Sequence, residues 1–382
     1  MKLIKTIFRI LLRLFAAVLG LGLMLAAALW LMQNIHPDSS VETSVSAQSK
    51  YKLSSALAVN QNNAKSDALT GLAYIEKIIS YSIPETDLVA PKPDPKKFGS
   101  TTDPAEITKL MSQYELSSGT QTAWSEDADF FPGQDFRYYC DDTILVVCWK
   151  EIIAKKVCSC AEVYIADGSQ LRRKIADDTY GSSVQLYASD MAESVNAVAA
   201  INGDFYSFRN LGITVYQRKL YRCSPLHVDT CFFTAGGDMI FSYANEIKTE
   251  EEAQKLIDEN DVVFAVAFGP VLIDNGEQRK IDSYAIGEVN GYYSRSCIGM
   301  LGDKHYFLMT MNEEGDCTER CMINELGSNM LGKGCIKAYT LDGGQTSTMI
   351  FNGTAFNRVD WGHERTMSDI IYFATAIPSG ED

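Results

Sequence analysis

The stretch IKAYTLDGG, residues Ile336–Gly344, joins an apolar run to an acid and two glycines. Its first six residues include the β-branched and aromatic types that favour a buried strand. A second strand-like run, HYFLMTM, begins at His305, and the helical pattern between the two runs begins at Thr318 and ends at Gly332. Strand, helix and strand in so short a span predict a βαβ unit with two parallel strands. Asp342 would then lie at the carboxyl end of a parallel strand.

Open α/β sheets bind ligands outside the carboxyl ends of their strands, so the position of Asp342 favours a ligand site. Gly343 and Gly344 follow at once, and glycines let the backbone turn sharply and bring its N–H groups close to an anionic oxygen. The alternative is a plain turn, because Asp-Gly is a strong turn sequence.

A second apolar run has a similar ending. Ala197–Ile201 leads directly into Asn202, Gly203 and Asp204, which are an amide, a glycine and a carboxylate. Here the alternative is an Asx-type turn, which Asn and Asp form readily. Both strand ends carry a carboxylate and glycine, so together they favour a ligand site more strongly than either does alone.

The dense part of the chain is predicted to be one domain, residues 130–378. Thr143–Trp149 and Ala161–Asp167 are strand-like, Asp190 has the pattern of a helix N-cap, and Asn275-Gly276 predicts a hairpin turn. The elements together predict an α+β or α/β fold, with a mixed β-sheet and flanking helices. One transmembrane helix and a stalk would precede this domain.

Residues 1–36 are predicted to be a basic cytoplasmic end and a membrane anchor. Four basic residues precede the uncharged run Leu14–Met32, whose 19 residues are close to the ~20 that cross a bilayer as a helix. The positive-inside rule then places the N-terminus in the cytoplasm and the C-terminal domain outside a single-pass cell membrane protein. A cleaved signal peptide is the alternative, since Ala26–Ala28 offers a cleavage site.

Residues 37–129 are predicted to be a stalk and linker with short helices. The first part is rich in Ser, Gln and Asn, and Ala90–Pro95 contains three prolines. Asp103, followed by proline and then by Glu106, predicts a helix start.

All ten cysteines lie at or beyond Cys140, in the part of the chain predicted to be exported. An even count in an oxidising compartment predicts disulfides, although the pairing cannot be read from the sequence. A zinc site is the competing interpretation, but the chain has no C-x-x-C and its four histidines are scattered.

The net charge of −15, without a run of Lys and Arg, argues against nucleic acid as a partner. A phosphate would have to be held locally by a few arginines, and Arg295 and Arg365 each precede a strand-like run. Surface ion pairs are the alternative for both arginines. The sequence also lacks a P-loop, H-E-x-x-H and G-x-S-x-G, which disfavours nucleotide-dependent phosphoryl transfer, zinc proteolysis and the usual serine hydrolases.

Four motifs occur in an order that is similar to the phosphodiester glycosidase family: Ala200–Arg222, Ala267–Glu277, Arg295–Met300 and Tyr339–Gly353. Some bacterial members of this family are described as exopolysaccharide-related proteins. The resemblance covers about residues 130–377. It implies a hydrolase that removes a sugar from a sugar-1-phosphodiester by cutting between the anomeric carbon and the phosphate oxygen.

The resemblance also implies roles for individual residues. Asp342 would be the main catalytic carboxylate and Asp204 the second, although the family often has a glycine where Asp204 stands. Substrate-binding roles fall on Asn202, Gly203, Arg295, Gly343, Gly344, Ser347 and Arg365, and His227 is added as a residue that titrates near neutral pH. No cofactor is required, while a divalent cation near the acids is compatible with the sequence.

The expected partners are a glycan phosphodiester of the cell envelope or extracellular space and, through the N-terminal helix, the membrane. A non-catalytic glycan-binding or exopolysaccharide assembly protein with the same fold is the first alternative. An adhesion module on a stalk is the second.

Overall fold

The structure, a computed structural model, describes residues 82–85, 87, 89–123, 135–224 and 226–377. The described residues form three β-sheets and a few short helices, so the α+β alternative is confirmed. All strand pairings among them are antiparallel, whereas the sequence predicted a mixed sheet.

The largest sheet has nine described strands, in the order β1 (Phe98–Thr101), β2 (Phe136–Cys140), β3 (Ile144–Ile153), β4 (Lys156–Ile165), β15 (His305–Asn312), β14 (Arg295–Gly302), β16 (Lys337–Leu341), β12 (Val271–Asp274) and β13 (Glu277–Gln278). The next sheet has the order β10 (Met239–Ser242), β9 (Thr230–Thr234), β11 (Val262–Val266), β7 (Gly212–Tyr216) and β8 (Lys219–Ser224). The last has the order β18 (Thr354–Ala355), β17 (Met349–Phe351), β6 (Ala199–Asn202), β19 (Asp369–Phe373) and β5 (Leu171–Ile175).

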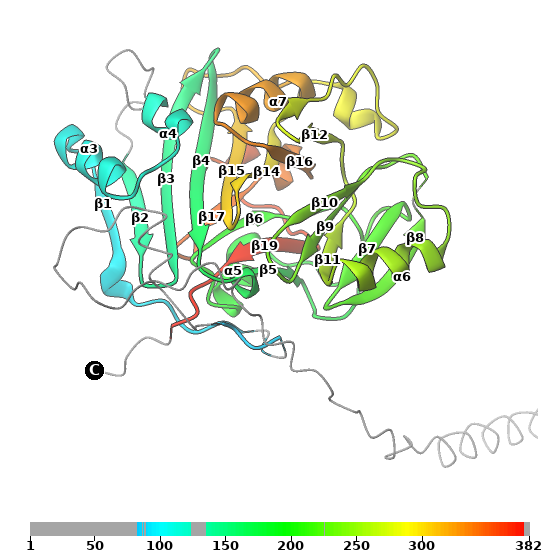
Figure 1. The fold of residues 1–382 in the computed structure, drawn as a ribbon. Helices are drawn as coiled ribbons and strands as arrows, with labels where there is room; N and C mark the ends of the chain where they lie inside the picture. Colours follow the sequence, from blue (N-terminus) through cyan, green and yellow to red (C-terminus); the bar gives the residue numbers. More distant parts are fainter. Residues whose placement is uncertain (1–81, 86, 88, 124–134, 225, 378–382) are drawn as a thin grey trace, which may run out of the picture. The chain divides into compact units, whose positions relative to one another are not determined.

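The described helices are α3 (Pro104–Gln113), α4 (Ser118–Ala123), α5 (Ala188–Ser194), α6 (Glu250–Glu259) and α7 (Ile323–Gly332). Single 3₁₀ turns are η1 (Pro95–Lys97), η2 (Gly168–Gln170), η3 (Gly287–Asn290), η4 (Gly344–Thr346) and η5 (Asp360–Gly362). In Figure 1, α3 and α4 lie beside β1 to β3, and α6 lies beside β8 and β11.

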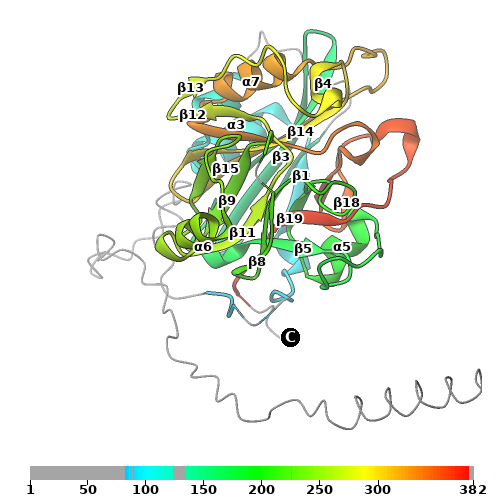
Figure 2. The same ribbon diagram turned by 90° about the vertical axis from the view of Figure 1, so that its right-hand side faces the viewer.

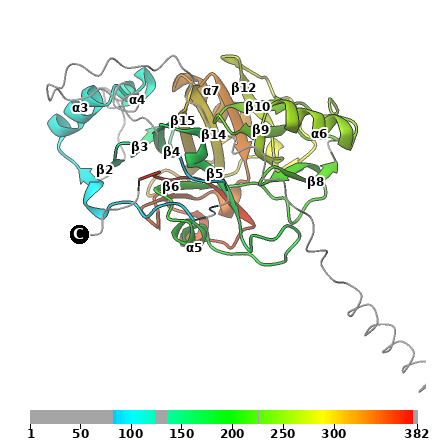
Figure 3. The same cartoon turned by 60° about the horizontal axis from the view of Figure 1, so that its bottom comes forward.

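Both faces of the large sheet are buried, which explains the continuous apolar runs of its strands. On β3, Leu145 and Val147 face a core that also contains residues of α3 and α7. Ile144 and Val146 face the opposite core, which they share with the two smaller sheets. Helix α6 packs on the second sheet and α5 on the third, as Figures 2 and 3 show from two further sides. The described fold is therefore layered, with helices outside and sheets inside.

The predicted strand–helix–strand unit is present, but its strands are not neighbours. β15 and β16 run in the same direction, because each pairs antiparallel with β14, which lies between them. Helix α7 begins at Ile323, later than the Thr318 that the sequence predicted. Asp342 does follow the carboxyl end of β16, as predicted.

The sequence predicted two further helix starts and one hairpin. Asp103 caps α3 and accepts the Ala105 N–H at 3.0 Å, as predicted. Helix α5, however, begins at Ala188, so Asp190 lies inside its first turn and is not the cap. Asn275 and Gly276 have φ of 51° and 77° between β12 and β13, which confirms the hairpin turn.

Several of the described residues before residue 124 belong to the large sheet and its core, although the sequence placed them in a stalk and linker. β1 pairs with β2 along its whole length, and Ile107 of α3 is buried in the core. The predicted boundary at residue 130 therefore does not mark the beginning of the packed structure. Among the described residues no helix has the length and apolar character needed to cross a membrane. The predicted anchor lies outside them and stays a prediction.

The structure contains none of the predicted disulfides, since no disulfide bond joins any of the ten cysteines. Eight of them are buried, and Cys140 and Cys223 are partly exposed. Burial raises the pKa of the Cys321 thiol to about 12, so it is protonated at neutral pH.

Titration of the purified chain in denaturant, without a reductant, is expected to detect all ten cysteines as thiols. In the native protein Cys140 and Cys223 should react first, because the other thiols are buried. A count that rises only after reduction would contradict the structure.

Candidate active site

The ends of β6 and β16 lie side by side, although the two strands belong to different sheets. The Asp342 N–H donates to the Gly203 carbonyl at 3.1 Å. The buried Asn202 amide donates to the Asp342 carbonyl at 2.8 Å and accepts the Thr348 N–H at 3.1 Å. The structure therefore brings together the two strand ends that the sequence singled out. The Asn202 side chain holds these strand ends together through its two hydrogen bonds.

Asp342 is half-buried, and both of its carboxylate oxygens are held. Oδ1 accepts the Gly343 N–H at 2.9 Å, and Oδ2 accepts the Thr346 hydroxyl at 2.8 Å. Desolvation raises the pKa of Asp342 to about 6, against the lowering effects of these two hydrogen bonds and of the nearby Arg209 and Arg365. A carboxyl with this pKa changes its charge close to neutral pH, as a general base or acid does.

Asp342 borders a cavity of about 270 Å³. Its lining is rich in cations and aromatic rings. The arginines are Arg209, Arg295, Arg320 and Arg365, and the aromatic residues are Phe205, Phe268, Tyr293 and Trp361. The lining acids are Asp342, Asp360 and Glu288. A pocket with more cations than acids suits an anionic ligand.

Arg295 was predicted to bind phosphate, but its side chain is 2% exposed and bonded to backbone carbonyls. Nε donates to the Cys321 carbonyl at 3.2 Å, and Nη2 donates to the carbonyls of Val289, at 3.1 Å, and Gly291. Desolvation lowers the pKa of this guanidinium. The residue holds the loop around η3 in place. A phosphate-binding role is therefore not supported by its contacts.

Arg209 was not singled out from the sequence, although it lies within the first motif of the family resemblance. Its guanidinium carbon lies 5.0 Å from the ring centre of Phe205 and 5.3 Å from that of Phe268, and a nitrogen lies 3.4 Å from a Glu288 oxygen. Its buried Nη1 has no hydrogen-bond partner in the described structure. This nitrogen is available to a ligand.

Two more arginines complete the cationic lining. Arg320, also missed from the sequence, donates to Glu313 at 2.6 Å and lies 4.0 Å from Asp360. Arg365, which was predicted, is exposed and has no hydrogen bond or ion pair with any described residue. It is therefore free to contact an anion.

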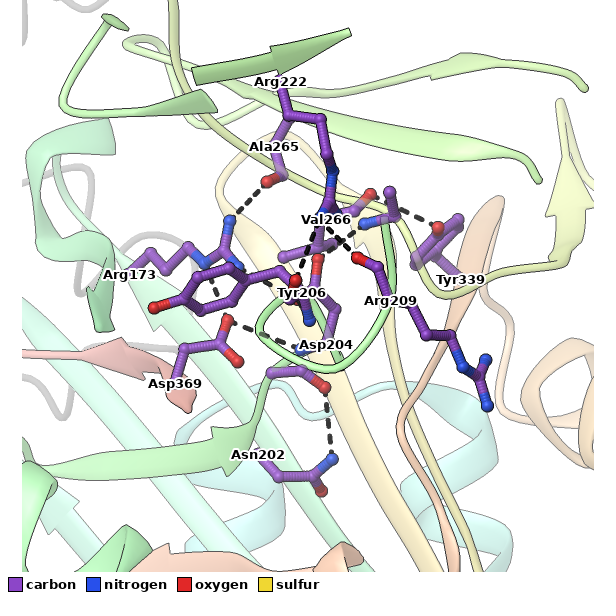
Figure 4. A network of polar contacts seen from close by, with 12 residues as sticks. Arg173, Asn202, Asp204, Tyr206, Arg209, Arg222, Ala265, Val266, Tyr339 and Asp369 are labelled. Atoms are coloured by element: carbon purple, nitrogen blue, oxygen red, sulfur yellow. Dashed lines mark hydrogen bonds and ion pairs between the residues drawn. The ribbon is translucent and has the colours of Figure 1, made fainter. Parts of the chain in front are cut away.

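Asp204, the second predicted carboxylate, is 4% exposed and belongs to a buried network (Figure 4). Arg173 Nη2 lies 3.1 Å from Asp204 Oδ1, and Arg173 Nε lies 2.7 Å from Asp369 Oδ2. Asp204 also accepts the backbone N–H groups of Tyr206 and Ala267, each at 2.8 Å. Because its oxygens are committed to these partners, Asp204 is placed to support the loop that follows β6.

One arginine in this network serves two acids. Desolvation raises the pKa of Asp369 to about 7. The positive charge of Arg173 lowers this pKa, and the negative charge of Asp204 raises it. A side chain at Gly203 would have its Cβ 2.2 Å from Asp369 Oδ2, so the backbone here approaches the carboxylate as only glycine can. Neither Arg173 nor Asp369 was singled out from the sequence, because each lies in a strand without a local motif.

The predicted glycine N–H groups are not available to an anion. The Gly343 N–H donates to Asp342, and the Gly344 N–H donates to the Ser294 carbonyl at 2.8 Å. Ser347 is fully buried and bonds Ser296 and the Arg295 carbonyl, each at 2.8 Å.

His227 is exposed and is not among the residues that line the cavity beside Asp342. Within the described ranges no group of three or more His, Cys, Asp or Glu residues is arranged to hold a metal ion.

Comparison with known proteins confirms the family resemblance. The family model described as phosphodiester glycosidase matches residues 195–374. The SPbeta prophage-derived protein YomE of Bacillus subtilis (strain 168) is 24% identical over 198 residues, which are 50% of this chain and 30% of that protein. The chain thus spans less than a third of this curated relative.

The solved structures to which the chain is similar have low sequence identity to it and TM-scores below 0.5. The catalytic domain of zebrafish N-acetylglucosamine-1-phosphodiester alpha-N-acetylglucosaminidase, auto-inhibited by its pro-peptide, has 16% identity and a TM-score of 0.49, over 61% of this chain and 83% of that one. A hypothetical protein from Synechocystis has 14% identity and a TM-score of 0.44, over 61% and 62% of the two chains.

Proposed function

We propose that this chain, whose residues 195–374 match the phosphodiester glycosidase family, hydrolyses a sugar-1-phosphodiester between the anomeric carbon and the phosphate oxygen. One observation carries the proposal. Asp342, a held carboxylate with a pKa raised to about 6, borders a cavity lined by four arginines. A base beside a cationic pocket suits a glycosyl group joined to a phosphate.

The reaction breaks the bond from the anomeric carbon to the bridging oxygen, and the electron pair of that bond leaves with the phosphate. A phosphodiester is a good leaving group, so no strong general acid is required. Arg365 and Arg209 would neutralise the phosphate charge, because they offer guanidinium nitrogens free of other partners. Asp342 would stabilise the oxocarbenium-like centre and take a proton from the attacking water.

A second, much smaller cavity supports the role of Asp342. It has a volume of about 10 Å³ and is lined by Asp342, Asp204 and Thr346 among other residues. This is close to the smallest volume that holds one water molecule, and the Asp342, Asp204 and Thr346 side chains supply polar atoms in a lining that also contains Phe205, Phe208 and Met367. A water placed here would lie beside the proposed base.

The other predicted site residues have supporting roles in this proposal. Asn202 and Gly203 fix the backbone of Asp342, and Asp204 holds the loop that carries Phe205 and Arg209. Gly344 has a φ of 66° with open space beside its Cα, so it leaves the cavity floor clear.

The cellular setting in the proposal rests on the sequence. The run Leu14–Met32 would anchor the chain in the membrane with the site outside, where glycan phosphodiesters of the envelope or extracellular space occur. Such a glycan is the proposed substrate.

The test uses the full chain, because β1 and α3 belong to the packed structure and a fragment from residue 130 would lack them. The purified protein is incubated with sugar-1-phosphodiesters that differ in sugar and in alcohol. Phosphorus NMR should show the diester converted to a monoester, while free sugar appears in equal amount. Binding without conversion across the panel would refute the hydrolase and favour the glycan-binding alternative.

The pH dependence of the reaction follows from Asp342. The base works when ionised, so kcat/KM is expected to fall about tenfold per pH unit below the raised pKa of about 6. An ordinary aspartate would hold the rate to about pH 4. The profile is measured from pH 4 to 8, with folding followed by circular dichroism at each pH. A rate that stays constant down to pH 5 would exclude Asp342 as the base.

A further inference from the structure

Trp361 is a large apolar side chain in an unusual position. It lines the cavity beside Asp342, yet it is 76% exposed. Its φ of 66° is a left-handed conformation that costs a bulky residue on the order of 1 kcal/mol. The turn is held on both sides, because Ser294 donates to Asp360 at 2.7 Å and the Gly362 N–H donates to Val359 at 3.1 Å. The fold thus holds an indole at the cavity mouth without burying it.

Each of the other three aromatic rings of the cavity has a guanidinium group packed near it. The guanidinium of Arg209 lies over both Phe205 and Phe268, and that of Arg295 lies 5.6 Å from the ring centre of Tyr293. Trp361, by contrast, has no ring or cation packed on it in the described part of the chain. Trp361 is the most exposed of the four lining rings, and Tyr293 is 37% exposed.

The surroundings of the indole suit a flat ligand with hydroxyl groups. The turns η4 and η5 pack against each other, and a Cβ added at Gly344 or Gly362 would meet open space within 4 Å. The Gln345 amide and the His363 ring lie beside them, with nitrogens 3.5 Å apart. A pyranose ring has an apolar C–H face and a polar edge of hydroxyl groups. The indole face suits the first, the polar side chains suit the second, and the open space beside the glycines leaves room for the ring.

We propose that Trp361 forms a second subsite, which stacks on a sugar ring in the alcohol part of the diester. The inference rests on the proposed function and names the substrate as a sugar joined through phosphate to another sugar. The direction follows from the cavity. The anomeric carbon must lie beside the proposed base Asp342, which is half-buried. Trp361 is at the exposed end, where the alcohol part would emerge.

The test compares two substrates with the same sugar-1-phosphate, one a methyl diester and the other a hexose diester. In the full chain, Trp361→Ala is expected to raise KM for the hexose diester about tenfold more than for the methyl diester. Trp361→Tyr, which keeps an aromatic face, should retain most of the difference. Tyr292→Ala is the matched control, because Tyr292 is 64% exposed and does not line the cavity.

Each other outcome has a defined meaning. An equal rise in KM for both substrates would place Trp361 on the released sugar and overturn the assignment, and unchanged values for both would exclude contact. If the parent chain converts neither substrate, calorimetry with the hexose diester separates the two proposals. Binding that weakens about tenfold in Trp361→Ala would then keep the subsite while the hydrolase fails, and equal binding would refute the subsite.

Discussion

Replacing Asp342 with asparagine is expected to lower kcat for the best substrate by about 10²- to 10⁴-fold, the usual contribution of a general base. Asparagine has nearly the same shape and keeps an oxygen for the Gly343 N–H, but it cannot accept a proton. KM should change much less, since the arginines remain. Steady-state kinetics on the purified full chain measures both constants.

The fold should tolerate this change, which separates lost chemistry from lost structure. The pKa of Asp342 is raised in the folded state to about 6, so its ionised form opposes folding above that pH. Asp342→Asn is therefore expected to be at least as stable as the parent at pH 7.5. Asp282→Asn is the control, because Asp282 is an exposed acid whose one ion-pair partner in the described part of the chain is Lys280. Full activity in Asp342→Asn would refute the assignment of the base.

Replacing Arg173 with methionine is expected to lower the free energy of unfolding by about 3–5 kcal/mol. Among the described residues Arg173 is the one cation that contacts both Asp204 and Asp369, and all three side chains are buried. Its removal leaves two acids close together without a counter-charge. Urea unfolding at pH 7.5 measures the difference. Arg218→Met is the control, because Arg218 also joins two acids, Glu85 and Asp261, but on the surface, where such pairs contribute about 0–1 kcal/mol.

The pH dependence of this deficit distinguishes lost charge pairing from lost packing. Without Arg173 the folded-state pKa of Asp369, which is already about 7, loses the lowering effect of the guanidinium charge and rises. A carboxyl with a raised folded-state pKa destabilises the fold above that pKa, and the penalty disappears as pH falls toward its unfolded value near 4. The deficit of Arg173→Met should therefore shrink between about pH 7 and pH 4. A deficit that is the same at both pH values would indicate a packing effect.

Local sequence signals were a good guide in most places, although those at Asp190 and Thr318 misplaced two helix starts. The turn at Asn275 and Gly276, the cap at Asp103 and the place of Asp342 after a strand follow from turn chemistry, capping and periodicity over a few residues. The motif order also pointed to the resemblance that the family model finds over residues 195–374. These features depend on neighbours along the chain, which the sequence displays directly.

Contacts between distant residues could not be read in this way. The sequence offered Arg295 and Asp204 as ligand contacts, but the fold buries both against internal partners and presents Arg209 and Arg320 to the cavity instead. The insertion of β14 between β15 and β16 was equally hidden, because strand order is decided by which apolar faces fit together.

The sequence by itself determined the apolar runs, the turns, the acid after β16 and the resemblance to the phosphodiester glycosidase family. Only the tertiary structure decided which charges meet. Arg173 and Asp369 are 196 residues apart in the chain, and they pair because β5 and β19 are neighbours in one sheet. A buried charge must find its counter-charge within hydrogen-bond reach. The internal pairs therefore decide which side chains remain free to contact a ligand, and only the tertiary structure shows those pairs.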